Sequence, residues 1–298
     1  MQYSICRVMA PKVKMHVEYT DIKVESLKIN GISSEKMVLL EDYVVKTMPD
    51  VLELQETKVN VDNLPPSMDI EEYDYAVNER TSDQKPGGGL VIYWKDSLPG
   101  RIWTNPKMHK NSKAQTEVQW LLLETGTSRL AVANIYLACV SSKNKNYLEW
   151  NTEIYNQLQE DITVLRDLCF GIIMMGDYNA RIGKYAGMEE NHAQINDNRK
   201  LLLNFVSQNE FYIMNKLNED KNCFTRKLNR KDGKNITKSC LDYFLISNKS
   251  RTGKWKFSIH DLCEENGIST DHSLIRITRS VLATKTVKKK KANKQASI

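Results

Sequence analysis

Hydrophobic and polar positions along the chain follow two periods, one typical of β-strands and one typical of helices. Residues 24–29 (VESLKI) alternate with period two and residues 51–55 (VLELQ) are mostly apolar, so both predict strands. Between them, two cap-type serines precede an apolar stripe at helical spacing, which predicts a helix: Met37, Leu40, Val44 and Met48. If the two strands are parallel, their carboxyl ends lie at the same edge of one sheet.

The alternation of strands and helices continues to the C-terminal part of the chain. Helical spacing predicts helices over residues 149–168 and about 197–209. Apolar or alternating runs predict further strands within residues 86–94, 117–123, 129–137, 170–175, 241–247, 254–259 and 273–278. This mixture of hairpins and crossovers favours a two-sheet α/β sandwich over a plain doubly wound sheet.

The composition is that of an ordinary globular chain of 298 residues, 41% hydrophobic and 27% charged. No stretch approaches about 18 consecutive apolar residues, which excludes a transmembrane helix, and the N-terminus lacks the apolar core of a secretory signal. Six cysteines are scattered without a C-x-x-C pair, so we expect free thiols in a reducing, intracellular compartment and no zinc site. The net charge of +6 hints at a polyanionic partner.

Polar side chains interrupt the apolar strands at their ends, where an α/β enzyme keeps its site: Asn30, Glu56, Tyr136, Asp177, Asn179, Asp242, Asp271 and His272. Taken singly, each has an ordinary explanation, such as a strand-end charge that faces water or a turn. A core strand would not tolerate carboxylates, an amide and an imidazole unless these groups converge and satisfy one another. The combination therefore predicts a functional site.

The ordered motifs LKINGIS, LQETK, NIYL, GDYNARIG, CLDYFLIS and STDHSLI resemble those of the endonuclease/exonuclease/phosphatase superfamily over about residues 24–280. The succession from GDYNARIG through FYIMN and FTRK to LDYFLIS is most similar to the abasic-site-endonuclease-like branch carried by non-LTR (LINE-type) retrotransposons. The resemblance implies a DNase-like α/β fold, a four-layer α/β/β/α sandwich with two packed mixed sheets flanked by helices. It also divides the chain into an N-terminal extension (1–23), the domain (24–280) and a basic tail (281–298) that we expect to be disordered.

The resemblance implies a divalent metal site. Glu56 would be the principal ligand of Mg²⁺, for which Mn²⁺ can substitute, and Asn30 and Asp271 would lie near it. Carboxylate and amide oxygens suit Mg²⁺, which keeps several waters and takes few protein ligands.

The resemblance also implies roles around a scissile phosphate. Asp177 would orient and help deprotonate the attacking water, and Asn179 would hold that water or a phosphate oxygen. His272 would contact the phosphate, and Asp242 would bind its other ring nitrogen to fix the tautomer. Tyr136 would lie against the phosphate or the leaving oxygen. Phosphodiester hydrolysis needs these parts: an in-line water, an orienting base and positive charge.

Charge is unevenly distributed along the chain. Residues 50–83 hold ten acidic and two basic residues, whereas residues 221–256 hold eleven basic and two acidic ones. The second stretch is predicted to be a basic arm that grips phosphates without reading sequence, although a solvated loop is the plainer alternative. Expected substrate contacts are Thr225, which matches a family threonine, and Arg181, Arg226, Lys227, Arg230 and Lys231.

Together these features predict a magnesium-dependent DNA endonuclease that leaves a 3′-hydroxyl. By resemblance, this hydroxyl primes reverse transcription during retrotransposition, which implies a reverse-transcriptase domain and the element RNA as partners and a nuclear location. No membrane partner is expected. Two alternatives stay open: another phosphoesterase of the superfamily (a phosphatase or an RNA-directed enzyme), and a domesticated domain that binds nucleic acid or protein but no longer cuts.

Overall fold

The computed structural model describes residues 21–59, 67–79, 88–106, 117–125, 128–139, 146–188, 196–219, 223–229, 236–248 and 254–280. The predicted basic tail and most of the predicted N-terminal extension lie outside these residues, as do Arg230 and Lys231. The first strand begins at Asp21 rather than at residue 24, so its start falls within the expected extension.

The first sheet has six strands in the order β13-β14-β1-β2-β4-β3. Its β1 and β2 run parallel, as a strand–helix–strand unit requires, and the other neighbours are antiparallel. The bounds of the strands are β1 (Asp21–Lys28), β2 (Val51–Gln55), β3 (Tyr73–Asn78), β4 (Leu90–Lys95), β13 (Lys254–His260) and β14 (Leu274–Ser280).

The second sheet also has six strands, in the order β5-β6-β7-β8-β12-β9. Here β7 and β8 are the parallel pair, and the hairpin expected between residues 117 and 137 is formed by β6 and β7. The bounds are β5 (Gly100–Trp103), β6 (Val118–Thr125), β7 (Ser128–Tyr136), β8 (Gly171–Asp177), β9 (Phe211–Ile213) and β12 (Asp242–Ser247).

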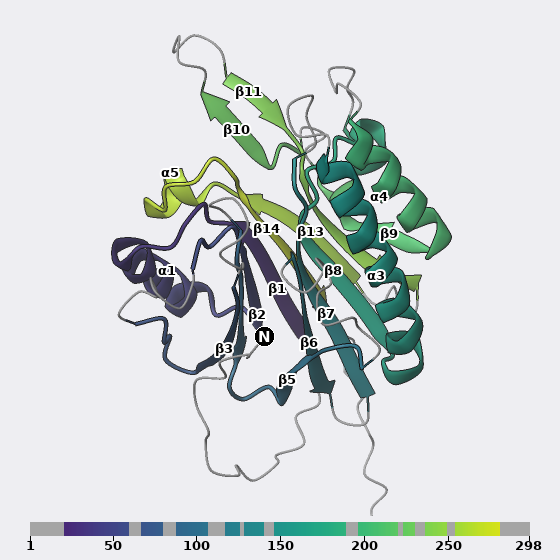
Figure 1. Ribbon diagram of the computed structural model, residues 1–298. Coiled ribbons are helices and arrows are strands. Elements are labelled where there is room, and N and C mark those ends of the chain that lie inside the picture. The colour runs from purple at the N-terminus through teal and green to yellow at the C-terminus, as the bar shows by residue number, and fades with distance from the viewer. Residues whose placement is uncertain are drawn as a thin grey trace, which may run out of the picture.

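Helices cover the outer faces of the two sheets (Figure 1). The first sheet carries α1 on its outer face, and the second carries α3 and α4. The helical segments are α1 (Ser34–Thr47), α3 (Asn146–Leu168), α4 (Asp197–Gln208), α5 (Leu262–Asn266) and the short 3₁₀ turns η2 (Gly183–Ala186) and η3 (Met214–Leu217). The four-layer α/β/β/α sandwich expected from the sequence is confirmed.

The main apolar core lies between the sheets, where Val51 and Ile92 of the first sheet join Val132 and Ile173 of the second. Buried polar contacts also cross this core, and one residue makes three of them. Asn134 of β7 donates from Nδ2 to the carbonyl oxygens of Leu54 (3.1 Å) and Val91 (3.0 Å), and its Oδ1 accepts from Gln55 Nε2 (2.8 Å). The amide thus ties the two sheets together inside a mostly apolar layer.

A two-stranded hairpin of β10 (Arg226–Asn229) and β11 (Ile236–Ser239) projects beyond the sandwich (Figure 1). Its base is joined to the domain by an antiparallel bridge between Arg226 and His272. The hairpin belongs to the predicted basic arm, although periodicity did not predict it. Periodicity also missed three other elements. These are β3, an edge strand in an acidic stretch; β5, an edge strand of four residues; and α5, a single helical turn.

Among the described cysteines every thiol is free, as expected from their spacing: Cys139, Cys169, Cys223, Cys240 and Cys263. In the part of the chain that the structure describes, no helix combines the length and the apolarity needed to cross a membrane.

Candidate active site

The predicted site residues come together at one edge shared by the two sheets. In the second sheet, Tyr136, Asp177 and Asp242 stand in register on three neighbouring strands. In the first sheet, Lys28 ends β1, and Glu56 directly follows β2. The parallel pairs β1–β2 and β7–β8 place these strand ends on the same side, as the sequence pattern predicted.

An aspartate–histidine pair lies at the centre of this edge. His272 Nδ1 is 2.9 and 3.1 Å from the two carboxylate oxygens of Asp242, and both side chains are buried. Burial alone would lower the pKa of His272, but the charge and hydrogen bond of Asp242, together with the charge of Asp177, outweigh it and raise this pKa. His272 Nε2 is buried and has no hydrogen-bond partner among the described residues. The imidazole is therefore oriented by Asp242 and has one ring nitrogen left for a ligand.

Thr225 supports the aspartate of that pair. Its hydroxyl donates to Asp242 Oδ2 at 2.5 Å and accepts from the backbone N–H groups of Leu241 and Asp242 at 3.0 and 3.1 Å. The residue is fully buried beside the base of β10. It holds the carboxylate rather than lining an open surface.

Asp177 and Asn179 form a second pair in the turn after β8. The backbone N–H and the side-chain Nδ2 of Asn179 donate to the Asp177 carboxylate at 2.8 and 3.1 Å. Asn179 adopts a left-handed conformation (φ 46°), which closes this turn, and its Nδ2 also donates to the Leu137 carbonyl at 2.7 Å. Burial, the largest influence, raises the pKa of Asp177, although the nearby Lys28 ammonium opposes it.

Lys28 lies between the two sheets' acidic groups and was not predicted from the sequence. Its Nζ is 2.9 Å from Glu56 Oε2 and 3.1 Å from Asp177 Oδ2, and 5.4 Å from the centre of the Tyr136 ring. Burial alone would lower its pKa, but the surrounding carboxylates raise it, so the ammonium stays charged. The sequence feature that could have indicated Lys28 is a lysine at the end of a predicted strand, two residues before Asn30.

Each residue predicted to lie near a metal is paired with a cation. Asn30 Oδ1 accepts from Lys58 Nζ at 2.6 Å, and Lys58 also lies 3.6 Å from Glu56 Oε1. Asp271 Oδ2 accepts from Arg226 Nε at 2.8 Å. Burial alone would raise the pKa of Asp271, but this hydrogen bond lowers it.

One group of ligand-type atoms among the described residues could share an ion: an oxygen each of Asp177 and Asp242 and a ring nitrogen of His272, all within 4.8 Å of one another. Carboxylate oxygens with an imidazole suit a divalent cation. The unpartnered Nε2 of His272 also fits a site that awaits a ligand. The residues therefore fit a metal, and the assignment of Glu56, Asn30 and Asp271 as its ligands stays a prediction.

The predicted substrate contacts lie around the site in different settings. Arg226 and Lys227 lie at the base of β10, where Arg226 pairs with Asp271 and Lys227 pairs with Asp261 Oδ2 at 2.5 Å. Arg181 lies in the loop after Asn179 and is half-buried.

A groove of about 690 Å³ adjoins this edge, and its lining includes Phe224, Lys227, Lys238 and Ser273. Phe224 and Ser273 are sequence neighbours of Thr225 and His272, but the lining of the groove includes neither Asp242 nor His272.

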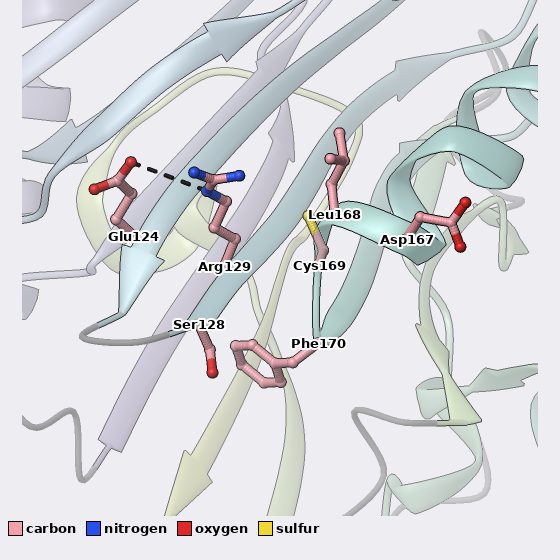
Figure 2. A pocket seen from close by; sticks show the side chains of 7 residues that line it. All are labelled: Glu124, Ser128, Arg129, Asp167, Leu168, Cys169 and Phe170. Carbon is pink, nitrogen blue, oxygen red and sulfur yellow. Dashed lines mark ion pairs between the residues drawn. The ribbon is translucent and has the colours of Figure 1, made fainter.

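A separate pocket lies at the opposite end of the same strands (Figure 2). Its lining includes Ser128 at the start of β7 and Phe170 just before β8, whereas the site is built on the carboxyl ends of these strands. Arg129 and Glu124 in this pocket are 4.0 Å apart (Figure 2). The pocket holds none of the predicted site residues.

Comparison with known proteins decides the family. The model of the "Endonuclease/Exonuclease/phosphatase family" matches residues 29–272, which span the site from Asn30 to His272. The chain belongs to the endonuclease/exonuclease/phosphatase family. The family resemblance expected from the motifs is thereby confirmed, while membership of a retrotransposon stays a prediction. A search of curated proteins finds no match.

Solved structures share the fold of this endonuclease/exonuclease/phosphatase family member at low sequence identity. The AP endonuclease of Leishmania major is 16% identical, with a TM-score of 0.67 over 88% of this chain and 89% of its own. A 3′ phosphatase from Neisseria, bound to a product DNA hairpin, is 15% identical, with a TM-score of 0.66 over 86% and 98%. The endonuclease domain of TRAS1, a telomere-specific non-LTR retrotransposon, is 12% identical, with a TM-score of 0.56 over 88% and 99%.

Proposed function

We propose that this protein is a metal-dependent DNA endonuclease that hydrolyses one phosphodiester bond and leaves a 3′-hydroxyl. The observation that carries the proposal is the Asp242–His272 pair, whose free Nε2 lies beside the Asp177–Asn179 pair at the shared sheet edge. The two pairs supply what phosphodiester hydrolysis requires, an orienting base and a donor to the developing negative charge.

Asp177 positions the attacking water and accepts its proton. Asn179 holds the carboxylate through two hydrogen bonds, so one geometry is favoured before the substrate binds. Burial raises the pKa of Asp177 from its ordinary value, which brings its basicity closer to what proton abstraction at neutral pH needs.

His272 donates from Nε2 to a phosphoryl oxygen, because Asp242 occupies its other ring nitrogen. The charge of Asp242 raises the pKa of His272 and favours the imidazolium, which stabilises the negative charge of the transition state. Tyr136, whose hydroxyl lies 3.4 Å from Glu56 Oε2, faces the same space. Burial raises the pKa of Tyr136, so its hydroxyl remains a donor at neutral pH.

The family fold implies a divalent ion, and the oxygen donors of this edge fit one. Glu56, with Asn30 and Asp271 beside it, would hold Mg²⁺ or Mn²⁺, which supplies positive charge to the phosphoryl oxygens when bound. The carboxylates and the amide are hard oxygen donors of the kind these ions prefer.

DNA is the substrate that the surroundings of the site favour. The groove at the base of β10 combines Phe224, a surface for base or sugar contact, with Lys238, which suits a phosphate, and with Lys227, which pairs with Asp261 in the same groove. The Neisseria structure with its DNA hairpin and the TRAS1 domain share the fold, which supports DNA over a small phosphoester. By the same likeness we propose that the 3′-hydroxyl primes reverse transcription in the nucleus, with a reverse-transcriptase domain and element RNA as partners.

A plasmid assay tests the proposal. Supercoiled DNA and Mg²⁺ are incubated with the wild-type protein, Glu56→Gln and His272→Ala, and the nicked product is offered to a DNA polymerase, which extends only a 3′-hydroxyl. We expect nicking and direct extension with the wild type, and a loss of about 10²–10³ in rate with each variant. Glu124→Gln and Arg129→Ala, in the pocket at the opposite end of the strands, serve as controls and should nick normally.

Two other results would each replace the proposal. Release of phosphate from a 3′-phosphorylated oligonucleotide without plasmid nicking would indicate a phosphatase. Tight, salt-sensitive DNA binding without any turnover in Mg²⁺ or Mn²⁺ would indicate a domain that binds but no longer cuts.

A further inference from the structure

Lys28 is the cation at the centre of the acidic edge. It is the last residue of β1. Its Nζ lies 2.9 Å from Oε2 of Glu56, which follows the neighbouring strand of the same sheet, and 3.1 Å from Oδ2 of Asp177, in the other sheet. Only 13% of its side chain is exposed, compared with 17% for Glu56 and 0% for Asp177. The ammonium is therefore a fixed part of the site rather than a surface charge.

The position of this ammonium conflicts with strong metal binding. Glu56 has both oxygens engaged by lysines, since Lys28 lies on Oε2 and Lys58 lies 3.6 Å from Oε1. A divalent ion that binds Glu56 must displace at least one of these ammonium groups or lie close to it. Like charges about 4 Å apart repel each other by several kcal/mol at an effective dielectric constant of about 20.

We propose that the Lys28 ammonium is a built-in cation of this site, which occupies the carboxylate oxygens of Glu56 and Asp177 and so makes the site bind a divalent ion weakly. The inference deepens the proposed function and rests on it for the identity of the site. It has a structural consequence as well. Without Lys28, the half-buried carboxylate of Glu56 and the buried carboxylate of Asp177 have no positive charge between them, so a divalent ion becomes the group that stabilises them.

Metal affinity, measured without any substrate, tests this inference. Mn²⁺ is titrated into the full-length protein, and free Mn²⁺ is followed by electron paramagnetic resonance. Lys28→Met removes the charge at similar length without adding an oxygen ligand, and Lys28→Arg keeps the charge. We expect Lys28→Met to bind Mn²⁺ at least about tenfold more tightly than the wild type, and Lys28→Arg to stay close to the wild type.

Lys95→Met is the matched control, because Lys95 is also half-buried and paired, 2.8 Å from Asp50, but lies at the other end of β2 and β4. Its Mn²⁺ affinity should equal that of the wild type. Equal or weaker Mn²⁺ binding by Lys28→Met would overturn the inference. The inference would also be overturned if the wild type binds Mn²⁺ with a submillimolar Kd and Lys28→Met binds it no more tightly.

Thermal unfolding provides a second readout in case Lys28→Met is unstable without metal. We expect Mn²⁺ to raise the Tm of Lys28→Met, or to restore its folded circular dichroism signal, at concentrations that leave the wild-type Tm unchanged. A Lys28→Met protein that Mn²⁺ fails to stabilise at those concentrations would contradict the inference.

The experiments distinguish failure of the proposed endonuclease activity from failure of the proposed role of Lys28. If the wild type does not nick DNA but Lys28→Met gains Mn²⁺ affinity, the proposed activity is wrong and the built-in cation stands. If the wild type nicks DNA but Lys28→Met gains no affinity, the activity stands and the role of Lys28 is wrong.

Discussion

Thr225 acts on the site through Asp242, since its hydroxyl both donates to the carboxylate and accepts from two backbone N–H groups. Thr225→Val keeps the shape but removes every one of these bonds. We predict that it lowers the nicking rate about 10- to 100-fold, because a loosened carboxylate holds the His272 ring less well. The rate is measured with supercoiled plasmid at saturating Mg²⁺.

Thr225→Ser is the control for this prediction, because it keeps the hydroxyl and should recover most of the rate. The pH–rate profile separates positioning from simple loss of stability. If Asp242 is loosened, the pKa of His272 falls, so the alkaline limb of the profile, where the imidazolium loses its proton, should move to lower pH. An unchanged profile with a lowered Tm would indicate that Thr225 only stabilises the fold.

Glu53 is a buried carboxyl that the proposed chemistry does not use. It is fully buried on β2, and neither carboxylate oxygen has a hydrogen-bond partner among the described residues. Burial raises its pKa well above the ordinary value. The folded state therefore binds a proton that the unfolded state releases, and stability falls as the pH rises from about 4.5 toward the raised pKa.

We predict that Glu53→Gln flattens this dependence. The wild-type free energy of unfolding should decline with pH more steeply than that of Glu53→Gln, by up to about 1.4 kcal/mol per pH unit. Urea unfolding between pH 4 and pH 8 measures the free energy of unfolding of both proteins. Glu35→Gln, on the exposed face of α1, is the control, and its free energy of unfolding should vary with pH as in the wild type. Identical slopes in wild type and Glu53→Gln would show that Glu53 is ionised in the folded protein.

At the scale of elements, the strand ends were the part of the site that the sequence could predict. Period-two runs located the strands, and polar residues placed where apolar runs stop, such as Asp177 and Asp242, indicated one common edge. Lys28 escaped this reasoning, because a strand-end lysine usually reaches water, and only the packing of the second sheet brings Asp177 against it. The same limit applies to the hairpin of β10 and β11, whose base is fixed by a bridge to distant His272.

Gly176 allows β7 and β8 to pair directly before the turn that holds Asp177 and Asn179. Its φ of 136° is outside the range of other residues, and a Cβ there would lie 1.9 Å from the carbonyl oxygen of Ile135. We predict that Gly176→Ala destabilises the protein by about 3 kcal/mol or more and abolishes nicking, because the next residue is Asp177.

Gly267→Ala is the control for that prediction. It also lies at positive φ (74°), but the nearest atom to a Cβ would be 4.0 Å away, so only backbone strain applies. Denaturant unfolding should show a loss of about 1 kcal/mol there. Equal losses at the two glycines would mean that the contact with Ile135 relaxes without effect.

At the scale of the whole molecule, the net charge of +6 resides in the last residues of the chain. Residues 285–298 hold six lysines and no acid, and the remaining chain is balanced with 37 basic and 37 acidic residues. We predict that deletion of residues 285–298 weakens DNA binding and reduces its dependence on salt, while the nicking rate at saturating DNA is unchanged. Fluorescence anisotropy at several salt concentrations measures the first effect, and a loss of nicking at saturation would mean that the tail supports the site.

The amide of Asn134 helps to fix the offset of the two sheets. Its bonds to Leu54, Val91 and Gln55 can all form only when the strands of both sheets are aligned as they are, whereas apolar contacts tolerate small slides. Since Glu56 and Asp177 come from opposite sheets, a slide of a fraction of an ångström separates the halves of the site while the core stays closed. We predict that Asn134→Leu changes the Tm by a few degrees at most but lowers the nicking rate about tenfold or more. A melting curve measures the first effect, and the plasmid assay measures the second. Fold stability and alignment of the site are then separate properties of this sandwich, and the second depends on a few buried polar side chains, of which Asn134 makes the most bonds between the sheets.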